Sequence, residues 1–91
     1  MELRWTQEAA EDLERIADYL FEHTPNRAER LVRALYDAPT TLLMFPNRGR
    51  AGKQEGTREL VMSPLPYIVV YAVRGDAVYL VRILHGAQRW P

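Results

Sequence analysis

The chain has 91 residues, 47% of them hydrophobic and 26% charged, so it is long enough for one domain with a modest core and too short for two. It contains no cysteine, which excludes a disulfide framework, thiol catalysis and cysteine metal sites. The formal net charge is zero, but residues 1–45 carry nine acids and five bases, whereas residues 46–91 carry seven bases and three acids. The basic half predicts a surface that attracts anions, either nucleic acid or an acidic protein segment.

The first five residues predict an exposed edge and no targeting signal. They lack the apolar run of a signal peptide, and no later segment is long enough to span a bilayer. We therefore expect a cytoplasmic protein without membrane association. Residues 3–5 are short and could form an edge strand.

Residues 6–45 predict a helical hairpin. Thr6 stands where an N-cap is expected, and apolar residues then recur at helical spacing to about residue 23. Thr24 and Pro25 restart the pattern, because proline suits the first helical position, and a second apolar stripe runs to Leu35. Pro39 is expected to kink or interrupt this second helix, and residues 40–45 to add a further helical turn.

The remaining chain predicts a glycine-rich loop and three strands. Residues 46–57 hold three glycines and three bases, but without the spacing of a phosphate-binding loop. Residues 58–62, 67–73 and 77–84 read as antiparallel strands joined by short turns. The order β-α-α-β-β-β predicts one α+β domain, residues 1–91, with the helical hairpin packed on one face of a mainly antiparallel sheet.

Both faces of this sheet are apolar in the sequence. Strict alternation along the last strand separates Tyr79, Val81 and Ile83 from Val78, Leu80, Arg82 and Leu84. Because two helices cannot cover both faces, we expect some apolar sheet surface to remain open for a partner.

Polar and aromatic groups gather where the last strand ends. Arg82 interrupts the apolar run, and Gln88, Arg89 and Trp90 follow the strand. With Arg50 of the loop, these residues are our candidates for contacts with a target. A salt bridge for Arg82, with Glu59 as a candidate partner, is an equal alternative, since an unpaired buried guanidinium is costly.

His85 closes the strand and has two interpretations. Its imidazole could act as a general base, or it could hydrogen-bond the backbone or a partner protein. The other histidine, His23, lies at a helix end without an evident ligand set, so we expect no metal site and no cofactor.

Five short stretches, taken in order, resemble the RelE/ParE superfamily of bacterial type II toxins. They are Ala-Ala-Glu-Asp-Leu at 9–13, Gly-Arg at 49–50, Arg-Glu-Leu at 58–60, Pro-Tyr-Ile-Val-Val-Tyr at 66–71 and Arg-Ile-Leu-His at 82–85. The resemblance covers essentially the whole chain. It implies the toxin of a toxin–antitoxin, or plasmid stabilization, module, held inactive in a hetero-oligomer with a cognate antitoxin. We assign Ile68 and Val70 to antitoxin binding.

The resemblance leaves two targets open. ParE-like toxins inhibit DNA gyrase, whereas RelE-like toxins cleave messenger RNA in the ribosome. RelE-like nucleases commonly place an arginine in the central strand, where this chain has Ile68, and the lysines of their preceding strand are missing from residues 59–62. We therefore favour gyrase. If the chain is a nuclease, His85 and Arg58 are the candidate catalytic residues; a non-toxic homologue that still binds antitoxin is the third alternative.

Overall fold

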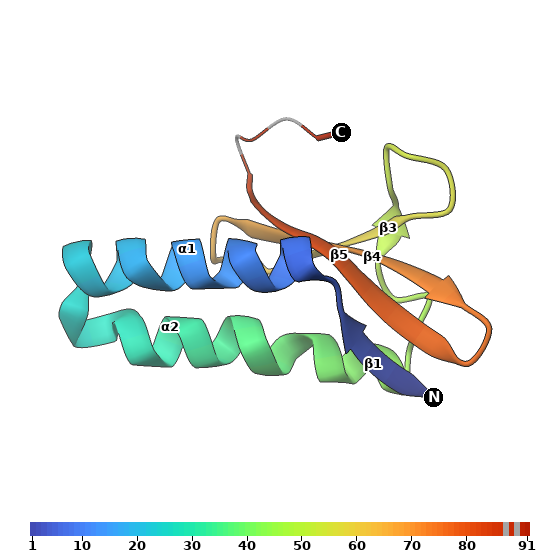
Figure 1. Cartoon of the computed structure of the whole chain (residues 1–91), viewed down its shortest axis with the longest axis horizontal. Helices are drawn as coiled ribbons and strands as arrows, with labels where there is room; N and C mark the ends of the chain where they lie inside the picture. Colours follow the sequence, from blue (N-terminus) through green and yellow to red (C-terminus); the bar gives the residue numbers. More distant parts are fainter. Residues whose placement is uncertain (87, 89) are drawn as a thin grey trace.

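The computed structural model of the chain describes residues 1–86, 88, 90 and 91. Helices α1 (Gln7–His23) and α2 (Pro25–Asp37) form a hairpin that extends from the sheet along the long axis of the molecule (Figure 1). Within the described residues the sheet has five strands: β1 (Glu2–Trp5), β2 (Arg50–Ala51), β3 (Arg58–Val61), β4 (Tyr67–Arg74) and β5 (Ala77–His85). This confirms the predicted α+β class and the helices packed on a mainly antiparallel sheet.

The sheet order is β1-β5-β4-β3-β2, and β1 pairs with β5 in parallel. The other neighbours are antiparallel. Strand β2 was not predicted, because two residues inside a glycine-rich loop leave no apolar pattern. It pairs with β3 and extends the sheet by one short strand.

Thr6 sets the place where β1 becomes α1. Its Oγ1 accepts a hydrogen bond from the N–H of Ala9 at 3.1 Å, which confirms the predicted cap. The same hydroxyl donates to the carbonyl oxygen of Leu80 at 2.8 Å. The first turn of α1 is therefore tied to β5 at the point where β1 stops pairing.

The second helix ends as the proline position requires. Helix α2 stops at Asp37, and a 3₁₀ helix, η1 (Ala38–Leu43), follows directly. Pro39 lies in the first turn of η1, where its missing N–H is not needed, and it is buried together with Leu42. The helical turn predicted for residues 40–45 therefore exists, beginning two residues earlier.

A β-bulge in β5 changes which side chains face the core. Tyr71 pairs with Leu80, and the preceding residue of β4 pairs with Arg82, which leaves Val81 without a partner. Leu80 and Ile83 consequently both belong to the core, with exposed fractions of 0% and 2%. The prediction from strict alternation, which put these two residues on opposite faces, is wrong.

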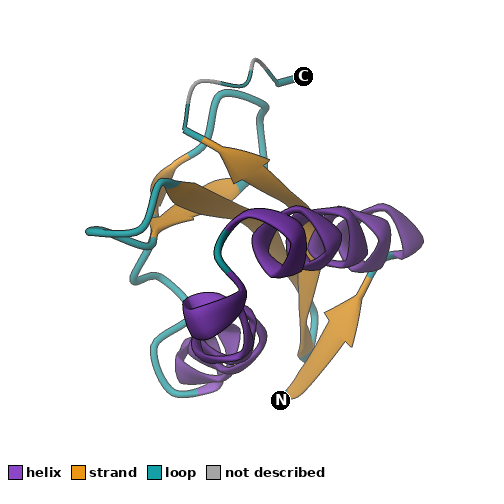
Figure 2. Cartoon of the chain, turned by 90° about the vertical axis from the view of Figure 1, so that its left-hand side faces the viewer, coloured by secondary structure: helices purple, strands orange, loops and turns teal. Residues whose placement is uncertain are grey.

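The core lies between the helical hairpin and the sheet. Its buried members come from both layers: Ala9, Leu35, Leu42, Leu60, Tyr67, Val69, Tyr71, Val78, Leu80 and Ile83. Figure 2 looks along α1 and α2 from the end at which they are joined. None of the helices in the described part of the chain combines the length and the apolar character needed to cross a bilayer.

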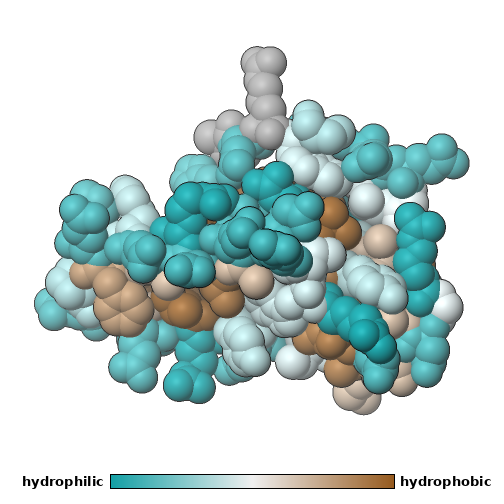
Figure 3. All heavy atoms as spheres, viewed as in Figure 1, coloured by the Kyte–Doolittle hydropathy of each residue, from teal (hydrophilic) through white to brown (hydrophobic). Residues whose placement is uncertain are grey.

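Open apolar surface lies on the helices as well as on the strands. Val70 and Leu84, on the side of the sheet away from the core residues, are buried, whereas Val61 of β3 is exposed. The exposed aromatic side chains of the hairpin are Tyr19, Phe21 and Tyr36. Figure 3 shows apolar side chains gathered in a band between the two helices. The expected open sheet surface is thus limited, and the hairpin supplies apolar surface that the sequence analysis did not single out.

Candidate functional site

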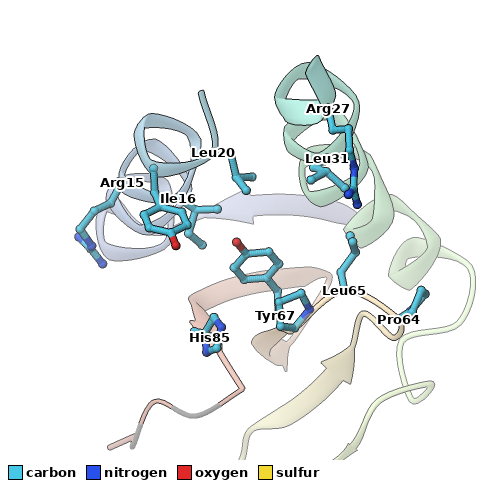
Figure 4. Close-up of a pocket in the computed structure, with 11 residues that line it drawn as sticks. Arg15, Ile16, Leu20, Arg27, Leu31, Pro64, Leu65, Tyr67 and His85 are labelled. Atoms are coloured by element: carbon cyan, nitrogen blue, oxygen red, sulfur yellow. The ribbon is translucent and has the colours of Figure 1, made fainter. Parts of the chain in front are cut away.

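A cleft of about 530 Å³ opens between the helical hairpin and one end of the sheet. Its walls come from α1, α2, the turn between β3 and β4, and the facing ends of β4 and β5. Figure 4 shows Ile16 and Leu20 of α1 and Leu31 of α2 lining it, with Leu65 of the turn opposite them. Apolar walls of this size suit side chains from a bound protein segment.

Two tyrosines and His85 add polar groups to the cleft. The rings of Tyr67 and His85 meet edge to face with their centroids 5.9 Å apart. The Tyr67 hydroxyl is protonated at neutral pH and can donate a hydrogen bond, and burial together with the neighbouring Tyr19 phenol raises its pKa further. Tyr67 is therefore a hydrogen-bond donor in a mainly apolar wall.

Two arginines line the same cleft, Arg15 from α1 and Arg27 from α2. Arg15 is engaged with Asp12, whereas no side-chain hydrogen bond or ion pair joins Arg27 to any residue in the described part of the chain. Apolar walls with a cation at the opening fit a segment that combines apolar and acidic side chains.

Asp12 joins α1 to the edge of β5. Its carboxylate is 2% exposed and accepts a pair of hydrogen bonds from Arg82, from Nε at 2.6 Å and from Nη2 at 3.0 Å. The backbone N–H of Ile83 donates to the same carboxylate at 2.9 Å, and Arg15 donates to it as well. Strand β1 stops pairing with β5 at Leu80, so it offers no carbonyl oxygen to the N–H of Ile83. Asp12 accepts that hydrogen bond instead.

The charges of this cluster stabilise each other. Burial alone raises the pKa of Asp12, but the hydrogen bonds from Arg82 and Ile83, the positive charge of Arg82 and the hydrogen bond from Arg15 together hold it below its ordinary value. The hydrogen bond to Asp12 in turn raises the pKa of Arg82, against the effect of burial. Both groups are therefore ionised at neutral pH.

Glu59 is not the partner of Arg82, so that candidate pairing is wrong. Glu59 is buried, and its Oε1 accepts a hydrogen bond from Arg50 Nε at 3.0 Å and lies 2.9 Å from Nη2 in the same ion pair. The pairing follows from the sheet, in which Arg50 of β2 lies opposite Glu59 of β3. The Arg50 side chain remains 61% exposed and can contact a partner as well.

Arg58 and Tyr71 anchor the start of the glycine-rich loop. Arg58 donates through Nη1 to the carbonyl oxygens of Gly49 at 2.7 Å and Asn47 at 3.3 Å. The Tyr71 hydroxyl, inside the sheet, donates to the carbonyl oxygen of Pro46 at 2.7 Å and accepts from the Gly49 N–H at 2.8 Å. This role of Tyr71 was not predicted; the signal for it was a tyrosine in an aliphatic strand, whose hydroxyl needs a partner when it is buried.

The structure does not bring the two candidate nuclease residues together. Arg58 pairs with Tyr71, and His85 pairs with Tyr67, so they flank opposite ends of the same stretch of β4. Four residues along a strand span about 13 Å. Around His85 the structure places Gln88, whose Oε1 accepts the His85 backbone N–H at 3.3 Å.

The other candidate target residues stand as follows. Gln88 is exposed and Trp90 is half-buried, while Arg89 lies outside the described residues.

Of the two residues predicted to bind antitoxin, Ile68 is half-buried in β4, and Val70 has no exposed surface. Among the described residues no group of three or more histidine, aspartate or glutamate side chains could hold a metal ion.

Comparison with known proteins supplies the family. The model of the ParE toxin of the type II toxin–antitoxin system parDE matches residues 3–90. The chain belongs to the ParE toxin family. It is therefore a type II toxin of the RelE/ParE superfamily, and the family implies a cognate antitoxin as its partner.

Relatives of this ParE-family chain carry names from both branches. It is 39% identical to toxin RelE2 of Caulobacter vibrioides over 84 residues, which cover 92% of this chain and 93% of that protein. It is 36% identical to Y4kP of Sinorhizobium fredii over 89 residues, 98% of this chain and 92% of that protein. A solved structure of the chromosomal ParDE system from P. aeruginosa superposes with a TM-score of 0.85 and 27% identity, covering 93% of this chain and 95% of that one.

Proposed function

We propose that this ParE-family toxin acts by inhibiting DNA gyrase and does not cleave messenger RNA. The observation that carries the proposal is the placement of its polar residues. Arg58 and His85 lie at opposite ends of one stretch of β4, and Arg82 is bound on both carboxylate oxygens of Asp12. The groups that could hold a phosphate and move a proton are therefore separated or already occupied.

RNA cleavage by the 2′-hydroxyl needs those groups at a single phosphate. A general base has to lie within about 3 Å of the proton that it removes, and the cations that stabilise the developing charge have to contact the same phosphate. Arg58 instead donates to two backbone carbonyls, and the neutral Ile68 stands at the central-strand position where RelE-like nucleases commonly have an arginine. This arrangement supports a toxin that works by contact.

Pulse expression in a bacterium tests the proposal. We expect filamentous cells and DNA-damage signalling while translation continues at first, because a gyrase inhibitor acts on DNA. Prompt translation arrest with cleaved messages would identify the toxin as a ribosome-dependent endonuclease. Growth that is unaffected by full-length, folded protein would identify a non-toxic homologue.

Replacement of His85 by alanine should lower toxicity only modestly. The imidazole makes an edge-to-face contact with Tyr67 in the cleft. Under the proposal it is not a catalytic base, so its loss removes a packing contact and leaves the mode of toxicity unchanged. A catalytic base would contribute about 10²–10⁴-fold. The measurement is growth after titrated induction, with protein level and thermal unfolding of the purified variant as controls. A loss of message cleavage on the catalytic scale, in a variant that folds normally, would contradict the proposal.

We also propose that the antitoxin inserts an apolar segment with acidic flanks into the 530 Å³ cleft. Two observations support this assignment: the walls are apolar, and Arg27 has no side-chain partner among the residues that the structure describes. Ile68 follows Tyr67 in β4 and so faces the other side of the sheet, where it is paired with the exposed Val61; the segment would have to pass around the edge of the sheet to reach it. Val70 is fully buried, and its predicted role would require the antitoxin to uncover it.

Reversal of the charge at Arg27 tests the occupant of the cleft. Arg27→Glu should weaken antitoxin binding by roughly tenfold or more, because a like charge then faces the acidic segment. Arg30→Glu is the matched control, since Arg30 is an exposed arginine of the same helix that does not line the cleft. Titration calorimetry of both variants with the purified antitoxin measures the difference. Equal affinities for the two variants would remove Arg27 from the site.

For contacts with the target we propose cationic, amide and aromatic groups around the sheet. Arg50 and Gln88 are exposed, and Trp90 is half-buried, so each can present atoms to a large protein surface. Arginine and tryptophan are enriched among residues that dominate binding energy. Arg82 and Arg89 complete the set; Arg82 donates to Asp12 through Nε and Nη2, so only its remaining N–H groups can contact the target.

A further inference from the structure

The cleft of about 530 Å³ proposed for the antitoxin is called the antitoxin cleft below. The helical hairpin has a second groove, which is separate from this cleft and from the proposed target surface. It measures about 320 Å³ and lies between α1 and α2. Leu13 and Phe21 of α1 and Val32 and Tyr36 of α2 form its apolar lining, and Glu29 and Arg33 complete it. We call these six residues the hairpin groove.

The hairpin groove exposes aromatic surface that water contacts in the single chain. Phe21 is 52% exposed and Tyr36 is 57% exposed. The Tyr36 ring is also held in place, because it stacks on Trp5 with the centroids 5.6 Å apart and the planes 18° apart. Exposed, preordered aromatic rings are typical of the residues that dominate protein contacts.

The groove has one acidic and one basic side chain, Glu29 and Arg33. Neither Glu29 nor Arg33 forms an ion pair or a side-chain hydrogen bond with any residue that the structure describes. The two lie one turn apart on α2, about 6 Å along the helix axis. The cleft on the other side of the hairpin differs, since its charged lining residues are both arginines.

An acid and a base one helical turn apart can form two ion pairs with a second copy of the same helix that is related by a two-fold rotation. If an axis crosses α2 midway between residues 29 and 33, two antiparallel α2 helices place Glu29 of each copy against Arg33 of the other. Both ion pairs then form at once, and Val32 lies near the axis. A closed, self-complementary contact of this kind is how identical chains usually pair.

We propose that the hairpin groove binds a second copy of this chain, through an antiparallel contact between the two α2 helices. The hairpin presents a face of roughly 25 by 20 Å, given the 1.5 Å rise per residue and the width of two helices. This is smaller than the roughly 800 Å² per partner of a standard stable interface. The dimer is therefore weak and dissociates on dilution. It leaves the antitoxin cleft open.

Charge reversal gives a test with an internal rescue. Sedimentation of the full-length chain over a dilution series should show a monomer–dimer equilibrium. Glu29→Arg alone and Arg33→Glu alone should each raise the dimer dissociation constant by roughly tenfold or more, since like charges then meet across the axis. The double reversal, Glu29→Arg with Arg33→Glu, should restore the dimer, whereas Arg30→Glu should leave it unchanged.

The absence of cysteine provides a second readout. Val32→Cys should form a disulfide-linked dimer on mild oxidation, and Glu11→Cys, on an exposed part of α1, should not. A chain that stays monomeric at every concentration, or single reversals that dimerise like wild type, would overturn the proposal. A double reversal that fails to restore the dimer, or antitoxin that blocks the Val32→Cys cross-link, would also overturn it. Antitoxin affinity and gyrase inhibition are measured separately, so they can hold whatever the outcome here.

Discussion

Replacement of Asp12 by alanine is expected to lower the free energy of unfolding by about 3–5 kcal/mol, the cost of breaking a buried ion pair by removing one partner. The substitution leaves the N–H of Ile83 and the guanidinium of Arg82 without their acceptor. The Arg82 side chain is 23% exposed and can recruit some water, so we expect the lower end of this range. Urea unfolding followed by circular dichroism measures the change.

Glu14→Ala is the matched control for Asp12. Glu14 is an exposed acid on the same helix with no side-chain partner in the described part of the chain. Its removal should change stability by no more than about 0.5 kcal/mol. If both variants unfold at the same urea concentration, Asp12 does not connect α1 to β5 in the way described.

The same carboxylate gives a pH dependence with a defined sign. The pKa of Asp12 in the folded chain lies below its ordinary value of 3.8, so its stabilisation is fully present above that value. It is lost as the pH falls through the lower folded-state pKa. The difference in stability between wild type and Asp12→Ala should therefore be constant near neutral pH and shrink below pH 3.8.

Replacement of Gly49 by alanine is expected to destabilise the chain by about 3 kcal/mol, the upper part of the usual range for overpacking. An added Cβ would lie 2.7 Å from Cε1 of Tyr71 and 2.8 Å from the backbone oxygen of Glu59. It would also come within 2.8 Å of the Tyr71 hydroxyl, which bonds both Gly49 and Pro46. The loop must then move away from the sheet, and thermal unfolding measures the loss.

Gly86→Ala serves as the control for this substitution. Among the described residues, a Cβ on Gly86 would meet the backbone oxygen of Pro66 alone, at the ordinary contact distance of 3.6 Å. We expect its unfolding midpoint to stay close to that of wild type. A Gly49→Ala variant that matches Gly86→Ala would show that the loop accommodates the methyl group and that the Tyr71 contacts are not a rigid anchor.

Local signals in the sequence were enough to predict the helices and the long strands. Thr6 and Pro25 mark helix starts by their own chemistry, and the structure has both where expected. The bulge at Val81 was not predictable, because it depends on the pairing of β4 with β5 and leaves no residue pattern within β5. The register of β3 and of β5 against β4 also sets the distance between Arg58 and His85, and the order of the strands in the chain does not predict that register.

The most consequential polar residue was the hardest to recognise. Asp12 lies among the charged residues of an amphipathic helix, and its partner Arg82 is 70 positions away. Only the end of β1 at Trp5 brings them together, by leaving the edge of β5 open to α1. The cleft was missed for a similar reason, since its walls come from two helices, a turn and two strand ends that are distant in sequence.

Incubation of the purified toxin with DNA gyrase and plasmid DNA tests whether gyrase is its target. We expect loss of supercoiling or trapped DNA cleavage in the presence of the toxin, and its reversal by the cognate antitoxin. Programmed ribosomes should retain intact message at the same toxin concentration. Unaffected gyrase together with message cut at the ribosome, again reversed by the antitoxin, would show that this chain is a nuclease and not a gyrase inhibitor.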